Sequence, residues 1–275
     1  MDAKPLIIGG REFVRQGKTY VMGILNVTPD SFSDGGRWTN QDEALRHVEQ
    51  MIMDGADILD VGGESTRPGY VSVSCEEEIA RIAPVIEKIK TRFDIPVSLD
   101  TYKSSVAKAG IEAGADMIND IWGLKYDEQM APLIAGSGVS CCLMHNRNEA
   151  AYEDLLKDVG TDLAESLKLA ESAGIDRHKI ILDPGVGFGK GYEDNLEVIS
   201  RMDELMYLDC PLLLGCSRKS VIGLTLDLPV EKRLEGTLAT TVIAVMKGIS
   251  FVRVHDIKEN KRAIRMAEAI IQRRL

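Results

Sequence analysis

The sequence predicts an α/β fold of the (β/α)8 TIM-barrel type, and three observations support that prediction. Short apolar runs rich in valine, isoleucine and leucine recur about eight times along the chain. Stretches with the apolar spacing of amphipathic helices lie between them. The length of 275 residues is close to the roughly 250 residues of one such barrel. Runs that are apolar on both faces and separated by helices indicate parallel strands joined by right-handed crossovers.

The apolar runs are the expected strands, and the stretches between them are the expected helices. The strands are expected within residues 21–27, 58–63, 96–101, 117–123, 140–145, 179–185, 211–217 and 251–257. The helices are expected at residues 40–54, 76–93, 103–113, 152–173, 194–206, 233–247 and 257–274. Because no linker or low-complexity segment interrupts this series, we expect one domain over residues 1–275, with a doubly wound sheet as the alternative fold.

Two local patterns add detail to this fold. Residues 6–20 contain the turn signals GG and QGK, which predict a β-hairpin beneath the barrel. DGADILD at residues 54–60 and AGADMIND at residues 113–120 form a faint internal repeat. The repeat predicts two consecutive helix-to-strand junctions that are built alike.

Composition narrows the class of partner. The formal net charge of −10 argues against a nucleic-acid partner, because binding a phosphate backbone needs a basic surface. It does not exclude small anionic ligands, which respond to a few local cations. Five scattered cysteines without a CxxC pair predict reduced thiols in the core. Without a signal peptide or an apolar run of roughly 20 residues, the chain is expected to work in the cytoplasm.

Polar residues follow the expected strands at their carboxyl ends, where the chemistry of such barrels is located. These positions are Asn26, residues 60–66, Asp100, Asn119, His145, Asp183, residues 217–219, Arg253 and His255. Any one of them could cap the next helix, but their convergence on one rim predicts a site. The carboxylates and the amide suit a flat heterocycle with N–H groups. The cationic side chains suit anions such as a pyrophosphate and a carboxylate.

Two long loops, residues 28–36 and 62–74, follow the first two expected strands. Loops of this length on a compact barrel are typical of lids over a functional site. The segment DPGVGFGKG, residues 183–191, matches neither of the common phosphate-loop templates. Its glycines are interpreted as letting the backbone and Phe188 approach a planar ligand closely.

Seven motifs together carry a resemblance to a known family. They are GILNVTPDSFSDGG (23–36), GGESTRPG (62–69), SLDT (98–101), IND (118–120), DPGVGFGK (183–190), GCSRKS (215–220) and RVHD (253–256). In this order and spacing they resemble dihydropteroate synthase from about Gly23 to the C-terminus. The chain departs from the family pattern in HNRNEAAYED (145–154) and at Gly191, where a threonine is common.

The resemblance implies a homodimeric, Mg²⁺-dependent enzyme of folate biosynthesis that condenses 6-hydroxymethyl-7,8-dihydropterin pyrophosphate with p-aminobenzoate. It assigns the pterin to Asp100, Asn119, Asp183 and Lys219, with Asp100, Asp183 and Lys219 as catalytic residues. It assigns the pyrophosphate to Asn26, Thr66, Arg253 and His255, with Asn26 also the metal ligand. It places Arg67, Phe188 and Ser220 on the p-aminobenzoate side, and Phe32, Asp34 and Pro68 in closing loops. The dimer interface is expected within residues 237–275.

Other functions stay open at this point. A pterin-binding methyltransferase barrel shares the Asp/Asn set, but it would need a corrinoid partner and has no evident use for STRPG or SRKS. Loss of Asn26 or Lys219 would favour a catalytically silent pterin-binding protein, and both residues are present. A class I aldolase with Lys219 as its Schiff-base amine is disfavoured, because Arg218 and serines flank that lysine. The role of His145, near the ligand or within a loop, is also open.

Overall fold

The computed structural model describes residues 5–14, 17–27, 37–64 and 73–273. In these residues eight parallel strands form one sheet in the order β8-β7-β6-β5-β4-β3-β10-β9. A parallel bridge between Leu182 and Leu212 joins the two ends of the sheet, so the strands form a nearly closed barrel. The strands are β3 (Tyr20–Asn26), β4 (Ile58–Gly62), β5 (Val97–Asp100), β6 (Met117–Asp120), β7 (Ser140–Met144), β8 (Ile180–Asp183), β9 (Leu213–Leu214) and β10 (Phe251–Val254). The predicted barrel is confirmed, and each apolar run contains one strand.

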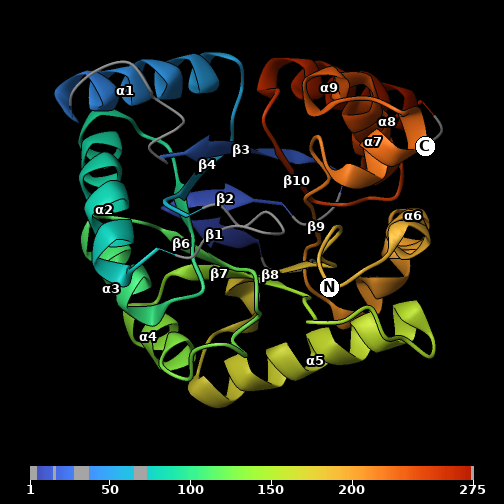
Figure 1. Cartoon of the computed structure of the whole chain (residues 1–275), viewed down its shortest axis with the longest axis horizontal. Helices are drawn as coiled ribbons and strands as arrows, with labels where there is room; N and C mark the ends of the chain where they lie inside the picture. Colours follow the sequence, from blue (N-terminus) through green and yellow to red (C-terminus); the bar gives the residue numbers. More distant parts are fainter. Residues whose placement is uncertain (1–4, 15–16, 28–36, 65–72, 274–275) are drawn as a thin grey trace.

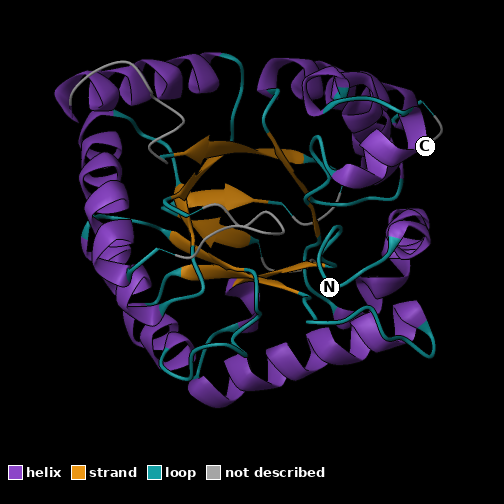
Figure 2. Cartoon of the chain, in the orientation of Figure 1, coloured by secondary structure: helices purple, strands orange, loops and turns teal. Residues whose placement is uncertain are grey.

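Helices surround the strands on all sides, as Figures 1 and 2 show. They are α1 (Arg37–Met53), α2 (Cys75–Arg92), α3 (Ser104–Glu112), α4 (Met130–Ser137), α5 (Leu155–Ala173), α6 (Tyr192–Arg201), α7 (Ser220–Leu226), α8 (Leu234–Met246) and α9 (Ile257–Ile271), with short 3₁₀ turns η2 (Arg177–Lys179), η3 (Met202–Leu208) and η4 (Val230–Lys232). Seven of them match the expected helices. The sequence did not predict α4 and α7, because segments of 8 and 7 residues hold too few turns to show a period.

The predicted N-terminal hairpin is present as β1 (Leu6–Ile8) and β2 (Arg11–Phe13), which pair antiparallel. Its buried side chains pack against the first residues of the barrel strands, and the rings of Phe13 and Tyr20 lie 4.8 Å apart between centroids. Ser140 Oγ, at the start of β7, donates a hydrogen bond to the carbonyl of Ile7 at 3.0 Å. The hairpin therefore covers the N-terminal end of the barrel (Figure 1).

The barrel interior is layered. Above the hairpin lies an apolar floor that includes Ile58, Met117, Ile181 and Phe251. Alternate side chains of a strand share one face, so the interior residues of the next layer are two positions further along. On these strands those residues are Asp60, Asn119, Asp183 and Arg253. The intervening residues, such as Leu59, Ile118, Leu182 and Val252, belong to the core between strands and helices. The polar residues thus lie on an apolar floor at the carboxyl end of the barrel.

The two copies of the internal repeat form the same hydrogen-bond arrangement at the start of a strand. Asp57 Oδ2 accepts a hydrogen bond from Val21 N at 2.7 Å, and Asp57 N donates to Val21 O at 2.8 Å. Asp116 and Val97 form the same reciprocal pair, with both distances 2.8 Å. A lysine from a covering helix binds each carboxylate, Lys261 the first and Lys90 the second. The expectation of consecutive junctions is wrong, because the two junctions lead into β4 and β6 with β5 between them.

The cysteines agree with the reduced core thiols that the composition predicts. Cys75, Cys141, Cys142, Cys210 and Cys216 are free thiols, and all but Cys75 are buried. In the part of the chain that the structure describes, no helix combines the length and apolar character needed to cross a membrane.

Candidate active site

Four of the predicted site residues line the mouth of the barrel from different strands. Asp100 ends β5 and faces Asn119 of β6 in the parallel ladder. Asp183 ends β8, and Arg253 lies within β10. Asp100, Asn119 and Asp183 are buried, and Arg253 is half-buried. The structure therefore brings the predicted acceptors and one predicted cation together at the mouth of the barrel.

Arg253 connects two buried carboxylates. Its Nε donates to Asp60 Oδ2 at 2.5 Å, and its Nη2 donates to Asp100 Oδ2 at 2.6 Å. Burial raises the pKa of Asp100 to about 7, although the charge of Arg253 acts in the opposite direction. The second oxygen of each carboxylate, Asp60 Oδ1 and Asp100 Oδ1, is buried without a hydrogen-bond partner among the described residues. Buried acceptors of this kind favour a ligand that brings N–H groups.

Asp183 and Lys219 are oppositely charged groups that lie near each other at the mouth, both beside Gly215. Burial raises the pKa of Asp183 and lowers the pKa of Lys219, and the charge of each residue opposes the shift of the other. Gly185 N donates to Asp183 Oδ1 at 2.7 Å, and Lys219 Nζ donates to the carbonyl of Val186. Gly215 keeps space beside both groups, since a Cβ there would stand 3.3 Å from Asp183 Oδ2 and 3.9 Å from Lys219 Nζ.

Lys219 also borders an aromatic surface. Its Nζ lies 4.6 Å from the ring centroid of the half-buried Phe188, close enough for a cation–π contact. Its neighbour Arg218 points elsewhere and binds Asp256, with Nε 2.9 Å from Oδ2. Ser220 begins α7 and is exposed. Arg218 and Ser220, which flank Lys219 in the sequence, therefore do not form the surroundings of its ammonium group.

Two more predicted residues lie near the rim. Asn26 is the last residue of β3, is half-buried and pairs with Gly62 of β4 in the ladder. His255 follows β10, and its Nδ1 lies 2.9 Å from Ser217 Oγ, while its backbone N donates to the same hydroxyl at 3.2 Å. The hydroxyl of Ser217 therefore links the loop after β9 to the end of β10.

His145 supports the loop after β8. Its Nε2 lies 3.0 Å from Asp162 Oδ2, and its Nδ1 lies 2.8 Å from Lys190 Nζ. Burial lowers the pKa of His145 to about 3 and that of Lys190 to about 7. The neutral imidazole therefore donates to Asp162 and accepts from Lys190. Lys190 Nζ also donates to the carbonyls of Gly185 and Phe188, each at 3.1 Å. These contacts place His145 behind the loop that carries Phe188.

The predicted residues Phe32, Asp34, Thr66, Arg67 and Pro68 lie outside the described residues. The two ends of the second loop are described and are joined by a buried charge cluster. Lys103 Nζ binds Glu64 Oε2 at 2.5 Å, Glu78 Oε2 at 2.8 Å and the carbonyl of Val73 at 2.9 Å. Val73 N in turn donates to Glu64 Oε2 at 3.1 Å. Lys103 therefore contacts both Glu64 and Val73 and holds the two ends of the loop together.

Sequence reasoning missed several of these groups. Asp60 lies in the strand-end segment 60–66, but no sequence motif indicates a role for it, and none indicates a role for Lys190 or Lys103. The repeat held a usable signal for Asp60, because Asp60 occupies the place in DGADILD that Asn119 occupies in AGADMIND. Lys103 and Lys190 carry no such signal, since their side-chain partners Glu78 and His145 come from elements distant in the sequence.

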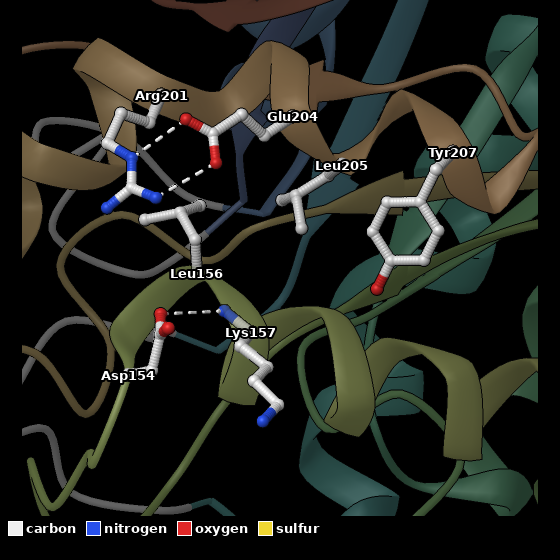
Figure 3. A pocket seen from close by; sticks show the side chains of 7 residues that line it. All are labelled: Asp154, Leu156, Lys157, Arg201, Glu204, Leu205 and Tyr207. Carbon is white, nitrogen blue, oxygen red and sulfur yellow. Dashed lines mark hydrogen bonds and ion pairs between the residues drawn. The ribbon is translucent and has the colours of Figure 1, made fainter.

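A separate hollow with a cavity volume of about 360 Å³ lies between α5 and η3 (Figure 3). It is lined by Asp154, Leu156, Lys157, Arg201, Glu204, Leu205 and Tyr207. The guanidinium of Arg201 is bound to Glu204 at 2.8 and 2.9 Å, which leaves it poorly placed to attract an anion. None of the strand-end residues lines this hollow, so it is not the predicted site.

Comparisons with known proteins relate the chain to one family. Residues 22–255 match the family model described as pterin binding enzyme. The chain is 57% identical to dihydropteroate synthase of Clostridium beijerinckii, over 97% of this chain and 99% of that protein. It is 53% identical to dihydropteroate synthase of Bacillus subtilis, over 93% of this chain and 90% of that protein.

Solved structures show the same likeness. A dihydropteroate synthase from Clostridium difficile, determined in the presence of pteroic acid, superimposes with a TM-score of 0.91 at 50% identity and covers 93% of this chain and 98% of its own. The Xanthomonas albilineans dihydropteroate synthase with 4-aminobenzoic acid has a TM-score of 0.92 at 40% identity, with 98% of both chains covered.

Proposed function

The chain belongs to the dihydropteroate synthases of the pterin binding enzyme family, and from that premise we propose which residues carry out the reaction. This reaction condenses 6-hydroxymethyl-7,8-dihydropterin pyrophosphate with p-aminobenzoate to give 7,8-dihydropteroate and pyrophosphate. The observation that carries the proposal is the polar cluster of buried Asp100, Asn119 and Asp183 with half-buried Arg253 at the barrel mouth, above an apolar floor. The relatives are named as synthases, which favours this reaction over the methyltransferase, the silent binder and the aldolase.

The pterin ring binds to Asp100, Asn119, Asp183 and Lys219. A dihydropterin carries ring N–H and amino groups, which need acceptors in a buried site. Asp100 and Asp183 offer carboxylate oxygens from opposite parts of the mouth, and Lys219 offers a donor beside Asp183. The apolar floor, which includes Cys142 and Ile181, packs beneath the ring.

The leaving pyrophosphate binds to Arg253 and His255 at the end of β10, with Asn26 at the end of β3 beside them and Thr66 from the second loop. β3 and β10 are neighbours in the sheet, so these side chains come from one sector of the rim. Two nitrogens of Arg253 are bound to Asp60 and Asp100, so it offers the pyrophosphate its remaining nitrogen, Nη1, together with its positive charge. Although the chain is acidic overall, Arg253 and His255 thus lie together where the pyrophosphate leaves.

Mg²⁺ is the proposed cofactor, and Asn26 is its protein ligand. The Asn26 amide oxygen lies beside Gly62, 3.7 Å from the point where a Cβ on that glycine would stand. Mg²⁺ is usually held by one or two protein oxygens together with waters and substrate phosphates, which fits a single amide oxygen here. When bound, the ion would neutralise charge on the departing pyrophosphate.

The bonds broken and formed in the condensation balance, and the reaction needs no strong base. The bond between the pterin methylene carbon and the pyrophosphate oxygen breaks, and its electron pair leaves with the pyrophosphate. The lone pair of the arylamine nitrogen forms the new C–N bond, and that nitrogen then releases one proton. An arylamine is already neutral at pH 7, so its lone pair is available. Asp100 and Asp183 favour the positive charge that develops on the pterin as the anion departs.

The p-aminobenzoate side is formed by Phe188, Ser220 and Arg67. Phe188 presents a half-buried ring beside Lys219, and Ser220 is exposed where α7 begins. An aromatic face and a hydroxyl suit a flat substrate that carries a carboxylate at its outer end. Arg67 lies in the second loop, whose two ends are joined by Lys103.

A homodimer is proposed through the C-terminal helices. The sequence of α8, LEGTLATTVIAVM, has Glu235 as its single charged residue. Exposed apolar side chains extend across α7, α8 and α9: Leu224, Leu226, Ile243, Met246, Met266 and Ile270. An apolar surface spread over neighbouring helices is typical of a subunit interface.

The cytoplasm is the proposed compartment. Five free thiols persist most easily where the medium is reducing. The proposed substrates are small polar molecules, so the reaction itself requires no membrane.

The test is direct. The purified chain is incubated with the pterin pyrophosphate, p-aminobenzoate and Mg²⁺, and dihydropteroate is measured by chromatography. We expect product with wild type, loss of product on chelation of Mg²⁺, and a large loss of turnover and pterin affinity for Asp183→Asn. A folded wild-type protein that forms no dihydropteroate overturns the proposal. Methyl transfer from a methylated folate to a corrinoid would instead support the methyltransferase.

A further inference from the structure

Asp60 lies between the proposed pterin side and the proposed pyrophosphate side of the site. We propose that Asp60 is a positioning residue whose carboxylate sets the direction in which Asn119 and Arg253 face the pterin pyrophosphate. The inference rests on the proposed function and extends it to a residue that none of the family motifs assigns.

Asp60 holds both neighbours with one oxygen atom. Its Oδ2 accepts from Arg253 Nε at 2.5 Å and from Asn119 Nδ2 at 3.3 Å. The side chain is fully buried, with 0% of the residue exposed. Removing a carboxylate from water is costly unless its partners compensate, and leucine or isoleucine would fill the same interior space without that cost. The carboxylate is therefore better explained by what it holds in place than by packing.

The contact with Asp60 determines the orientation of the Asn119 amide. A carboxylate can only accept hydrogen bonds, so the amide must direct its Nδ2 toward Asp60. The amide oxygen is then directed away from Asp60 and is available to accept from a ring N–H. Without the carboxylate the amide could rotate and present a donor in that place.

The same carboxylate determines the orientation of the Arg253 guanidinium. Nε is bound to Asp60 and Nη2 to Asp100, so two of the three nitrogens are held by carboxylates on β4 and β5. Two such contacts fix the plane of the group and turn its remaining nitrogen, Nη1, in one direction. A guanidinium fixed in this way loses less side-chain entropy when it binds a pyrophosphate.

The internal repeat places Asp60 and Asn119 at equivalent heights. Asp57 and Asp116 form the same reciprocal pair with the preceding backbone, and the site residue follows three positions later on β4 and on β6. β5 lies between these two strands. In the ladders, Asp60 pairs with Ser98 of β5, and Asn119 pairs with Asp100 of β5. Asp60 and Asn119 thus meet across the interior because both strands start from the same kind of junction.

Binding experiments with two ligands test the proposal. Affinities for the pterin pyrophosphate and for 6-hydroxymethylpterin, which lacks the pyrophosphate, are measured by calorimetry with wild type, Asp60→Asn and Asp60→Leu. We expect both variants to bind both ligands more weakly. The loss should be about tenfold or more for the pyrophosphate ligand, because it depends on Asn119 and Arg253 together. Wild-type affinity of the folded variants for both ligands would overturn the proposal.

A matched control separates positioning from stability. Asp57→Asn removes the same charge from the same stretch of chain but acts at the strand start, where Asp57 binds Val21 N and Lys261. We expect it to lower the melting temperature without changing either affinity. Equal loss of affinity in Asp57→Asn and Asp60→Asn would show a general effect on the barrel and would overturn the positioning role.

The pH profile gives a readout that stability alone does not move. The charge of Asp60 helps to raise the pKa of Asp100, so the acidic limb of kcat/KM should move to lower pH in Asp60→Asn. An unmoved limb would contradict the proposal. If wild type binds the pterin pyrophosphate but forms no dihydropteroate, the proposed function fails while the positioning role is still measured by the affinities.

Discussion

The guanidinium of Arg253 on β10 reaches across the barrel mouth to Asp100 on β5, with Nη2 and Oδ2 2.6 Å apart. β3 and β4 lie between these strands in the sheet, so the contact spans the interior rather than a ladder. Burial raises the pKa of Asp100 to about 7, and the charge of Arg253 limits the rise. The ionisation of Asp100 is thereby set close to neutral pH.

We predict that kcat/KM for the pterin pyrophosphate falls as the pH drops below about 7. A carboxyl with a raised pKa gains its proton on mild acidification, and neutral Asp100 no longer favours a positively charged pterin. Steady-state kinetics from about pH 5 to about pH 9 would show this limb. Asp100→Asn should lower kcat/KM by roughly 100-fold and abolish the limb. The exposed Asp94→Asn is the control; the same acidic limb in Asp100→Asn would assign it to another group.

We predict that Gly185→Ala destabilises the protein strongly. Gly185 has φ of +71°, and a Cβ there would stand 1.9 Å from the carbonyl oxygen of His145. The left-handed backbone alone costs an alanine about 1–2 kcal/mol, and the clash adds to this. Gly174→Ala is a matched control, because its φ is +92° and nothing lies within 4 Å of its Cβ position. Urea unfolding of both variants measures the difference, and equal losses would contradict the clash.

Much of the fold could be predicted because its signals are local. Each strand is a short apolar run, and a polar residue at its end marks the carboxyl rim, as at Asp100 and Asp183. The contacts within the rim could not be predicted in the same way. The sequence motifs indicate Arg253 only as a cation for the pyrophosphate, yet it binds two carboxylates from β4 and β5. Such pairs depend on which interior side chains meet when the barrel closes, and no local pattern encodes that.

His145 illustrates the same limit. Its position after a strand suggested either a ligand contact or a loop role, and the sequence could not decide between them. The structure decides for the loop, since Asp162 on α5 and Lys190 after β8 hold the two ring nitrogens. Both partners lie far from His145 in the sequence.

We predict that buried His145 makes stability depend on pH. Its pKa is lowered from 6.5 to about 3, so the folded protein keeps the imidazole neutral while the unfolded chain protonates it. The resulting stability is fully present above pH 6.5 and is lost as the pH falls toward 3. Wild type should lose up to about 1.4 kcal/mol per pH unit more than His145→Gln in this window. Urea unfolding at several pH values measures the slopes; His47→Gln, at an exposed site on α1, should keep the wild-type slope.

We predict that the C-terminal helices form the dimer interface. Met246 on α8 and Met266 on α9 expose 59% and 63% of their surface in the isolated chain, and Ile243 on α8 and Ile270 on α9 are exposed as well. Met246→Glu would place a charge inside the interface, where it would lose its water without gaining a partner. Sedimentation velocity should show a dimer for wild type and a monomer, or a much weaker dimer, for the variant. Met53→Glu is the control, because Met53 is 69% exposed at the end of α1. A stable dimer in Met246→Glu would place the interface elsewhere.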